Sequence, residues 1–217
     1  MIIAIDGPAG SGKSTISKLV AKDLDLIYLD TGAMYRLVTL KALEIGILDG
    51  NLEDLDKINE LLDNLEIDIR EDGFYLDGVD VSEEIRKPIV SENVSKIAAI
   101  KEVRIKMVDL QRKFSKAKNV ILDGRDIGTV VFPNADLKVF LVADARERAN
   151  RRYKELTEKG ENVSLEEIYQ NILMRDKIDS TREEAPLKKA EDAIEVDTTS
   201  KSIDEVKEEI LNLYKNL

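Results

Sequence analysis

The chain has 217 residues, of which 43% are hydrophobic and 35% are charged, so it is expected to be a soluble globular protein with one sizeable core. It contains no cysteine and no histidine, which excludes disulfides, Cys-ligated zinc, His-metal sites and Ser-His-Asp or Cys-His catalysis. Its formal net charge of −11 argues against a surface that coats nucleic acid. We find no stretch apolar enough for a signal peptide or a membrane span, and we expect a cytoplasmic protein.

The first residues predict alternating strands and helices. Ile2–Asp6 is an apolar strand, and a helix with one apolar side follows over Lys13–Asp23. Leu26–Leu29 predicts a second short buried strand, and Ala33–Ile45 predicts a helix that ends near Gly46. This alternation is typical of a parallel sheet that helices cover on both faces.

Between the first strand and the first helix the chain reads GPAGSGKST, which matches the phosphate-binding pattern Gly-x-x-x-x-Gly-Lys-Ser in full. Glycines allow the backbone N–H groups to turn inward onto phosphate oxygens, to which Lys13 adds a positive charge. The hydroxyl of Ser14, or of Thr15 beside it, can ligate Mg²⁺. We therefore expect the phosphates of a nucleoside triphosphate to be bound by Gly7, Pro8, Ala9, Gly10, Ser11, Gly12, Lys13, Ser14 and Thr15.

A second polar segment, LDTGAMYR, follows the second strand. In a parallel sheet this position lies at the carboxyl edge, beside the phosphate loop. Asp30, Thr31 and Arg36 are therefore candidates for binding a second ligand. The same residues would also fit an ordinary turn into a helix that carries a surface arginine.

The pattern of alternating strands and helices is interrupted in the middle of the chain. Leu65–Ser82 alternates apolar and polar residues and contains the turn signals EDG and LDG, which predicts a small antiparallel insertion. Two helices are expected after it, near Pro88–Ala99 and over Lys101–Phe114.

The parallel pattern then resumes, with central strands predicted over Val120–Gly124 and Leu137–Val142. Asp123, Arg125 and Asp126 lie at the carboxyl edge of the first of these. Burying such charges is costly unless they have a function, although a solvated loop would also explain them.

Later helices carry more arginines. A charged helix over Ala145–Lys159 has three of them on one face, which favours either a mobile cationic lid or a solvated face. On the next helix, capped by Ser164, an apolar stripe is continued by charged residues, as in a helix that leaves the core and enters a polar cleft. A surface ion pair is the alternative. The arginines of the first helix are Arg148, Arg151 and Arg152, and the charged continuation of the second is Arg175, Asp179 and Arg182. A last strand over Ala193–Thr198 and an amphipathic helix end the chain.

A phosphate loop combined with several arginines and aspartates suits phosphoryl transfer, which depends on positioning and charge neutralisation. A P-loop switch that only hydrolyses a nucleotide is the alternative from a different class, but a switch has no need of a second phosphate clamp.

The chain resembles the bacterial cytidylate (CMP/dCMP) kinases, a family of nucleoside monophosphate kinases, from about Ile2 to Leu213. The motifs that carry the resemblance are IDGPAGSGKST, LDTGAMYR, DVSEEIR, DGRDIGTVVFP, and the later RD and APL. It implies one α/β kinase domain over 1–217 with a P-loop NTPase fold, in which helices flank a five-stranded parallel sheet. The core would comprise about 1–60, 95–145 and 165–217, with an antiparallel monophosphate-binding insertion near 61–94 and a helical lid near 146–164.

The resemblance also implies roles for individual residues. Lys13, Arg125, Asp126 and Arg175 would be catalytic. Ser14 would ligate the Mg²⁺ that is bound together with ATP. The nucleoside monophosphate would be bound by Asp30, Thr31, Arg36, Ser95, Arg104, Arg125, Asp126, Arg175, Asp179 and Arg182, of which Ser95 and Arg104 would read the cytosine base and Asp179 would bind the ribose hydroxyls.

The expected substrates are thus ATP with CMP or dCMP, with no nucleic-acid or membrane partner, and the protein is expected to be a monomer. A kinase for another small acceptor, such as UMP, AMP or shikimate, remains the alternative within the same class.

Overall fold

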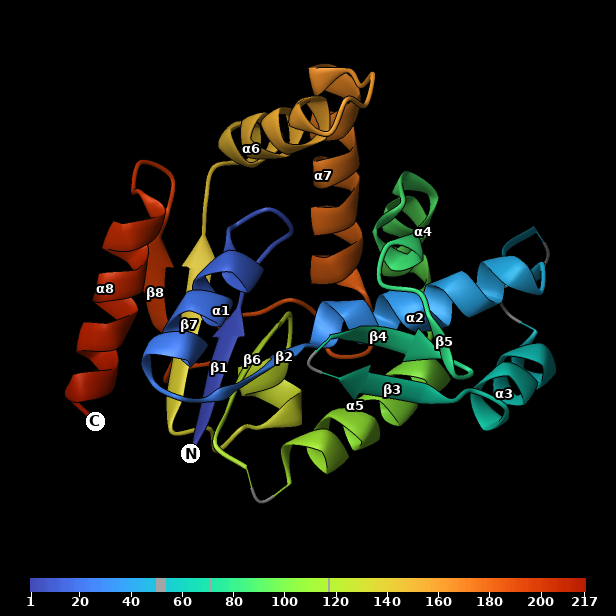
Figure 1. Ribbon diagram of the computed structural model, residues 1–217, viewed down its shortest axis with the longest axis horizontal. Coiled ribbons are helices and arrows are strands. Elements are labelled where there is room, and N and C mark those ends of the chain that lie inside the picture. The colour runs from blue at the N-terminus through green and yellow to red at the C-terminus, as the bar shows by residue number, and fades with distance from the viewer. Residues whose placement is uncertain (50–53, 71, 117) are drawn as a thin grey trace. The chain divides into compact units, whose positions relative to one another are not determined.

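The computed structural model describes residues 1–49, 54–70, 72–116 and 118–217 (Figure 1). The chain divides into two compact units. The first unit comprises Met1–Asp30 and Phe114–Leu217, and the second comprises Thr31–Lys113. Each unit has a sheet and a buried apolar cluster of its own.

A five-stranded parallel sheet forms the centre of the first unit, with the strand order β2-β6-β1-β7-β8. The register places Asp6 of β1 opposite Gly124 of β6, and Asp30 of β2 opposite Asp123 of β6. The carboxyl ends of these three strands therefore lie at one edge of the sheet. The predicted parallel sheet and its strands are confirmed as β1 (Ile2–Asp6), β2 (Ile27–Asp30), β6 (Val120–Gly124), β7 (Leu137–Val142) and β8 (Ile194–Asp197).

Two helices of the first unit, α1 (Lys13–Asp23) and α8 (Ile203–Lys215), pack with the sheet in one apolar cluster. Ile16 of α1, Ile210 of α8 and Ile5 of β1 are all buried in it. This packing fixes the start of α1, and with it the end of the phosphate loop, against the central strand.

Three further helical segments of the first unit follow β6 and β7. They are η3 (Ile127–Val131), which is a π-helical turn, α6 (Ala145–Glu158) and α7 (Leu165–Thr181). The hydroxyl of Ser164 accepts a hydrogen bond from the backbone N–H of Glu167, so the predicted cap of α7 is confirmed. The turn η3 was not predicted, since the sequence analysis assigned no element between the strands Val120–Gly124 and Leu137–Val142.

The second unit contains the predicted antiparallel insertion, a three-stranded sheet with the order β3-β4-β5. Ala33, Leu37 and Leu76 contribute to its apolar cluster. Of the predicted EDG turn, Glu71 lies outside the described residues. The elements of this unit are α2 (Thr31–Glu44), η1 (Ile47–Asp49), α3 (Leu55–Asp63), β3 (Ile67–Arg70), β4 (Gly73–Leu76), β5 (Val79–Asp80), η2 (Glu84–Arg86), α4 (Pro88–Ala98) and α5 (Lys101–Ser115), whose last two residues belong to the first unit.

Helix α3 is an element that the sequence analysis missed. Its apolar residues Ile58, Leu61 and Leu62 are buried on one side, and Asp54 caps it by accepting from the backbone N–H of Lys57. The cap and the 3–4 spacing were both present in the sequence and would have predicted this helix.

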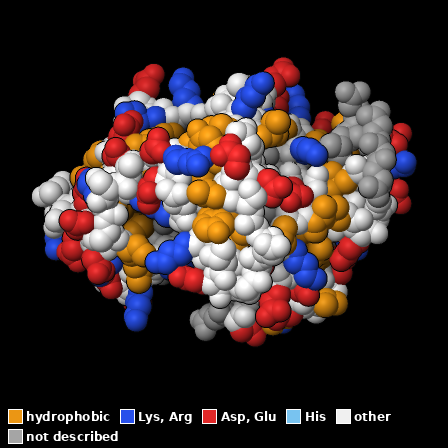
Figure 2. Space-filling model, turned by 90° about the horizontal axis from the view of Figure 1, so that it is seen from above, with side chains coloured by type: hydrophobic (Ala, Val, Ile, Leu, Met, Phe, Trp, Pro, Cys, Tyr) orange, Lys and Arg blue, Asp and Glu red, His pale blue; other side chains and the backbone are white. Residues whose placement is uncertain are grey.

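Within the part of the chain that the structure describes, no helix combines the length and the apolar character that crossing a bilayer requires. On the face shown in Figure 2, the described basic and acidic side chains are interspersed rather than gathered into one basic surface. This mixture agrees with the formal net charge of −11.

Candidate active site

The phosphate loop connects β1 directly to α1. The backbone at Gly7 passes so close to Leu141 that only glycine fits, because a Cβ built there would lie 2.2 Å from the carbonyl oxygen of Leu141. Gly12 precedes α1 with a φ of 91°, which L side chains rarely adopt. The glycines of the motif therefore give the loop a backbone path that other residues could not follow.

Lys13 is buried and folds back over this loop, where its Nζ donates to the carbonyl oxygen of Pro8 at 2.7 Å. Burial lowers the pKa of Lys13 well below its ordinary value, and the nearby Arg125 lowers it further. A phosphate bound in the loop would favour the charged ammonium, so the site is electrostatically suited to an anion.

Ser14 and Tyr28 both donate to the carboxylate of Asp123. The Ser14 hydroxyl lies 2.7 Å from Oδ2, and the Tyr28 hydroxyl lies 2.8 Å from Oδ1. Burial raises the pKa of Asp123 to about 6, with a further contribution from the neighbouring Asp30.

This pair of oxygen ligands bears on the expected Mg²⁺. A hydroxyl and a carboxylate in contact are the hard oxygen ligands that Mg²⁺ prefers, and Mg²⁺ commonly takes its other ligands from water and substrate phosphates. No group of three or more His, Cys, Asp or Glu side chains able to hold a metal occurs among the described residues. The hydroxyl of Ser14 and the carboxylate of Asp123 therefore fit Mg²⁺ as two of its ligands.

Asp6, the last residue of β1, is buried and binds the backbone that follows β6. Its two carboxylate oxygens accept from the N–H groups of Ile127 and Gly128, each at 2.8 Å. Burial raises the pKa of Asp6 to about 6, although these two N–H groups oppose the shift. Because Arg125 and Asp126 come just before Ile127, Asp6 fixes the start of the turn that follows them.

A cluster of charges lies near the same edge of the sheet. Arg125 Nε donates to Asp179 Oδ2 at 2.9 Å, and Arg182 lies 3.9 Å from carboxylate oxygens of both Asp126 and Asp179. Burial raises the pKa of Asp179, but the guanidinium groups of Arg125, Arg175 and Arg182 outweigh burial and hold it below its ordinary value.

These contacts correct two of the alternative interpretations. Asp123 and Asp126 are only 4% and 3% exposed, so the solvated loop is wrong. Asp179 is 3% exposed and pairs with Arg125, so a surface pair with Arg175 is wrong as well. Arg182, which was expected on the helix, lies one residue beyond the end of α7.

Arg175 has a buried Nε that makes no hydrogen bond with any described group. Burial lowers its pKa to about 10, and the positive charge of Arg125 adds to the effect. Arg175 as a whole is half-buried, and a buried donor that makes no hydrogen bond is costly until an anion accepts from it. Arg175 is therefore well suited to bind a phosphate.

Other predicted residues lie in the second unit. Arg36 is half-buried, and its Nη1 donates to the carbonyl oxygen of Ile85 at 3.0 Å and to Ser91 Oγ at 2.8 Å, so it is not a surface arginine. Arg104 is buried, with its guanidinium over the Tyr35 ring and its Nη1 donating to the carbonyl oxygen of Ala98.

The predicted site residues thus fall into two groups by unit. Asp30 and the phosphate loop share the first unit with the cluster around Arg125, and Lys13 lies close enough to Arg125 and Asp179 for their charges to shift its pKa. The second unit carries Thr31, Arg36, Ser95 and Arg104, of which Thr31, Ser95 and Arg104 are buried.

Sequence reasoning gave no role to Asp6, Tyr28 or Asp176, and named Asp123 only as an edge charge. An acidic residue at the end of a central strand was a signal for Asp6 and Asp123. Nothing local pointed to Tyr28 or to Asp176, because their partners are distant in the chain.

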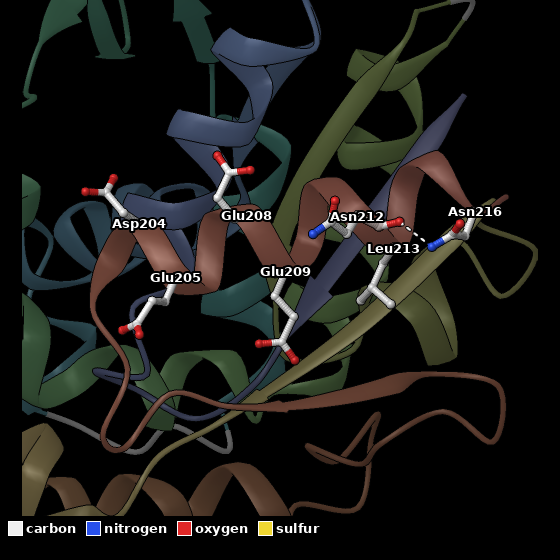
Figure 3. Close-up of a pocket in the computed structure, with 7 residues that line it drawn as sticks. All are labelled: Asp204, Glu205, Glu208, Glu209, Asn212, Leu213 and Asn216. Carbon is white, nitrogen blue, oxygen red and sulfur yellow. Dashed lines mark hydrogen bonds between the residues drawn. The ribbon is translucent and has the colours of Figure 1, made fainter.

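A shallow hollow of about 560 Å³ lies along α8, away from this cluster (Figure 3). Its lining is one helix face with four carboxylates, and its Asn216 side chain donates to the carbonyl oxygen of Asn212 at 2.8 Å. Carboxylates repel phosphates, so this hollow is not a second nucleotide site. The lining residues are Asp204, Glu205, Glu208, Glu209, Asn212, Leu213 and Asn216.

Comparison of the fold supports one class of protein. The chain is similar in fold to a shikimate kinase from Bacteroides thetaiotaomicron, with a TM-score of 0.52 at 11% identity, over 99% of this chain and 98% of that one. An uncharacterised protein from Eubacterium ventriosum gives a TM-score of 0.53 at 14% identity, over 100% and 99% of the two chains. Together with the Gly7–Thr15 loop, this likeness defines a protein of the P-loop fold.

Sequence comparison identifies the family. The cytidylate kinase family model matches residues 3–216. A cytidylate kinase of Fusobacterium nucleatum is 58% identical over 206 residues, which are 95% of this chain and 93% of that protein. One of Clostridioides difficile is 56% identical over 212 residues, 98% of this chain and 97% of the relative. The chain belongs to the cytidylate kinase family and is a phosphotransferase.

Proposed function

We infer that the protein transfers the γ-phosphate of ATP to CMP or dCMP, giving ADP and CDP or dCDP. Family membership supports this reaction. One structural observation supports it further. In addition to the phosphate loop, the first unit has a cluster of three arginines around Asp179, which are Arg125, Arg175 and Arg182. A nucleotide switch needs one phosphate site, whereas a kinase for a phosphorylated acceptor needs two.

On the donor side, Gly7–Thr15 binds the ATP phosphates through backbone N–H groups and the start of α1. Lys13 leaves the Pro8 carbonyl and pairs with a phosphate oxygen. Ser14 and Asp123 would hold the Mg²⁺, which would neutralise charge on the donor phosphates.

On the acceptor side, we assign the phosphate of CMP to Arg36, Arg125 and Arg182, with Asp126 beside the reacting groups. Asp179 receives the ribose hydroxyls, and Asp30 and Thr31 lie near the phosphate and sugar. Ser95 and Arg104 recognise the base, since a hydroxyl and a guanidinium can bond the carbonyl and ring nitrogen of cytosine. Arg175 neutralises charge on the group in transfer.

The chemistry needs no histidine or cysteine. A phosphate monoester has a second pKa of about 6, so the acceptor phosphate is mostly deprotonated at neutral pH and attacks without a general base. Arginines then reduce the repulsion between two anionic substrates. Closure of the lid near 146–164 and the insertion near 61–94 excludes water, so that ATP is not hydrolysed.

We further propose that the protein acts as a monomer in the cytoplasm, without a nucleic-acid or membrane partner.

The first test is an ADP-release assay with ATP·Mg²⁺ and, in separate reactions, CMP, dCMP, UMP, AMP, shikimate or no acceptor. We expect fast turnover with CMP and dCMP and little without an acceptor. Equal ADP release in every reaction would instead support the hydrolytic switch, and turnover with a different acceptor alone would reject the assignment of CMP.

A further inference from the structure

The carbonyl groups of the phosphate loop need hydrogen-bond donors. Because the N–H groups of such a loop turn toward the phosphate, its carbonyl groups face other partners and need donors from elsewhere in the protein. The carbonyl oxygen of Ala9 accepts from Arg148 Nη1 at 3.0 Å. The carbonyl oxygen of Ser11 accepts from the Thr198 hydroxyl at 3.2 Å, and Arg151 Nη1 donates to that hydroxyl at 3.2 Å. Both arginines belong to α6.

All three nitrogens of the Arg148 guanidinium donate hydrogen bonds. It is 4% exposed, its Nε donates to the carbonyl oxygen of Ala143 at 2.9 Å, and its two Nη atoms donate to the two carboxylate oxygens of Asp176 at 3.1 and 2.6 Å. Arg148 is therefore not on a solvated face, which was one of the two alternatives that the sequence left open for this helix.

The same residue packs on the tip of the loop. A Cβ built on Gly10 would lie 3.2 Å from Arg148 Cβ and 3.5 Å from its carbonyl oxygen. The loop is thus joined to α6 by a side-chain hydrogen bond at Ala9, and at Gly10 it passes so close to α6 that a side chain would crowd Arg148.

Asp176 completes the connection from α7. It follows Arg175 and precedes Asp179 by three residues, so α7 carries two predicted substrate residues and also the carboxylate that orients Arg148. Only a planar, two-pronged cation can bond both oxygens of Asp176 and still reach Ala9.

We propose that Arg148 and Asp176 are positioning residues of the donor site, which hold the phosphate loop in the conformation that binds ATP. The inference rests on the proposed function, because it takes Gly7–Thr15 as the ATP loop. A buried ion pair is by itself weak evidence for stability. The bond to Ala9 and the close approach at Gly10 give this pair a role that a simple connection between two helices would not have.

The test uses the full-length variants Asp176→Asn and Arg148→Lys, with ATP and CMP varied separately. We expect KM for ATP to rise on the order of tenfold, while KM for CMP changes by less than about twofold because the acceptor residues are untouched. Calorimetric titration with ADP should show the same loss of affinity. The double variant should be little worse than either single one, since both changes break one connection.

The chain offers a matched control. Arg146 and Glu166 form an ion pair at 2.9 Å that also joins α6 to α7. Their side chains are 50% and 59% exposed. Among the described residues, neither forms a hydrogen bond with the phosphate loop. Arg146→Lys and Glu166→Gln should leave both KM values and the ADP affinity unchanged.

Each variant is assayed at a temperature where its melting curve shows that it is folded. Unchanged ATP kinetics and ADP affinity, or an equal rise in both KM values, would overturn the proposal. Failure of both variants to fold at any temperature would also overturn it, since the pair would then serve the fold alone. The ADP titration needs no acceptor, so its result stands even if CMP proves to be the wrong substrate.

Discussion

At the scale of single residues, the candidate site combines buried charged side chains with partners that restrain them. Lys13 is the clearest case, because burial lowers its pKa while a carbonyl oxygen is its main neighbour. Such a residue costs stability in the free protein and is useful only when an anion arrives.

We therefore predict that Lys13→Ala lowers kcat at least on the order of a hundredfold, because it removes a charge from the phosphates in transfer. The melting temperature of the free protein should not fall, since the variant no longer buries a cation. Steady-state kinetics and thermal unfolding measure the two effects. Turnover near that of the unchanged protein would reject the donor assignment.

At the scale of elements, helix α7 shows how one regular structure serves both the core and the site. Ile172 is buried, and beyond it the helix carries Arg175, Asp176 and Asp179. Their spacing was visible in the sequence, and it placed Arg175 and Asp179 correctly on one face. Their partners were not visible, since Arg125 and Arg148 are distant in the chain.

Asp179→Ala offers a test of the acceptor side of α7. We expect KM for CMP to rise on the order of ten- to a hundredfold, the cost of losing hydrogen bonds to a charged group. KM for dCMP should rise less, because one ribose hydroxyl is missing from that substrate, and dCMP thus serves as the internal control. Equal changes for the two nucleotides would argue against contact with the 2′-hydroxyl.

The same contrast explains which elements could be predicted. Strands such as β1 and β6 are apolar runs, and the phosphate loop is a contiguous motif, so local sequence was enough. The turn η3 depends on hydrogen bonds to Asp6, 121 residues earlier in the chain. The sequence from Ile127 to Val131 has no periodic pattern that could have indicated the contact with Asp6.

At the scale of the whole molecule, stability and pH are linked through buried carboxyl groups. The pKa of Asp123 rises from 3.8 to about 6 on folding, so the folded state binds a proton more tightly than the unfolded state. The contribution of Asp123 to stability is therefore greatest below about pH 4 and is lost as the pH rises through about 6. Moving the pKa this far corresponds to about 3 kcal/mol.

Asp123→Asn should remove this loss. We predict that, without nucleotide or Mg²⁺, the free energy of unfolding of the variant relative to the unchanged protein rises between about pH 4 and pH 6.5, by up to about 3 kcal/mol. Urea unfolding at several pH values measures the difference, in which the other titrating groups cancel. A difference that does not vary with pH would contradict the raised pKa.

The carboxylate of Asp6 limits how this protein could be redesigned. Residue 6 sits one position before the donor loop, yet it fixes the backbone beside Arg125 and Asp126 on the acceptor side. We expect a substitution at residue 6 to alter recognition of both substrates at once, so this position cannot be used to adjust one of them separately. A search for a new acceptor specificity should leave this connection intact and vary Ser95 and Arg104, which lie in the other unit.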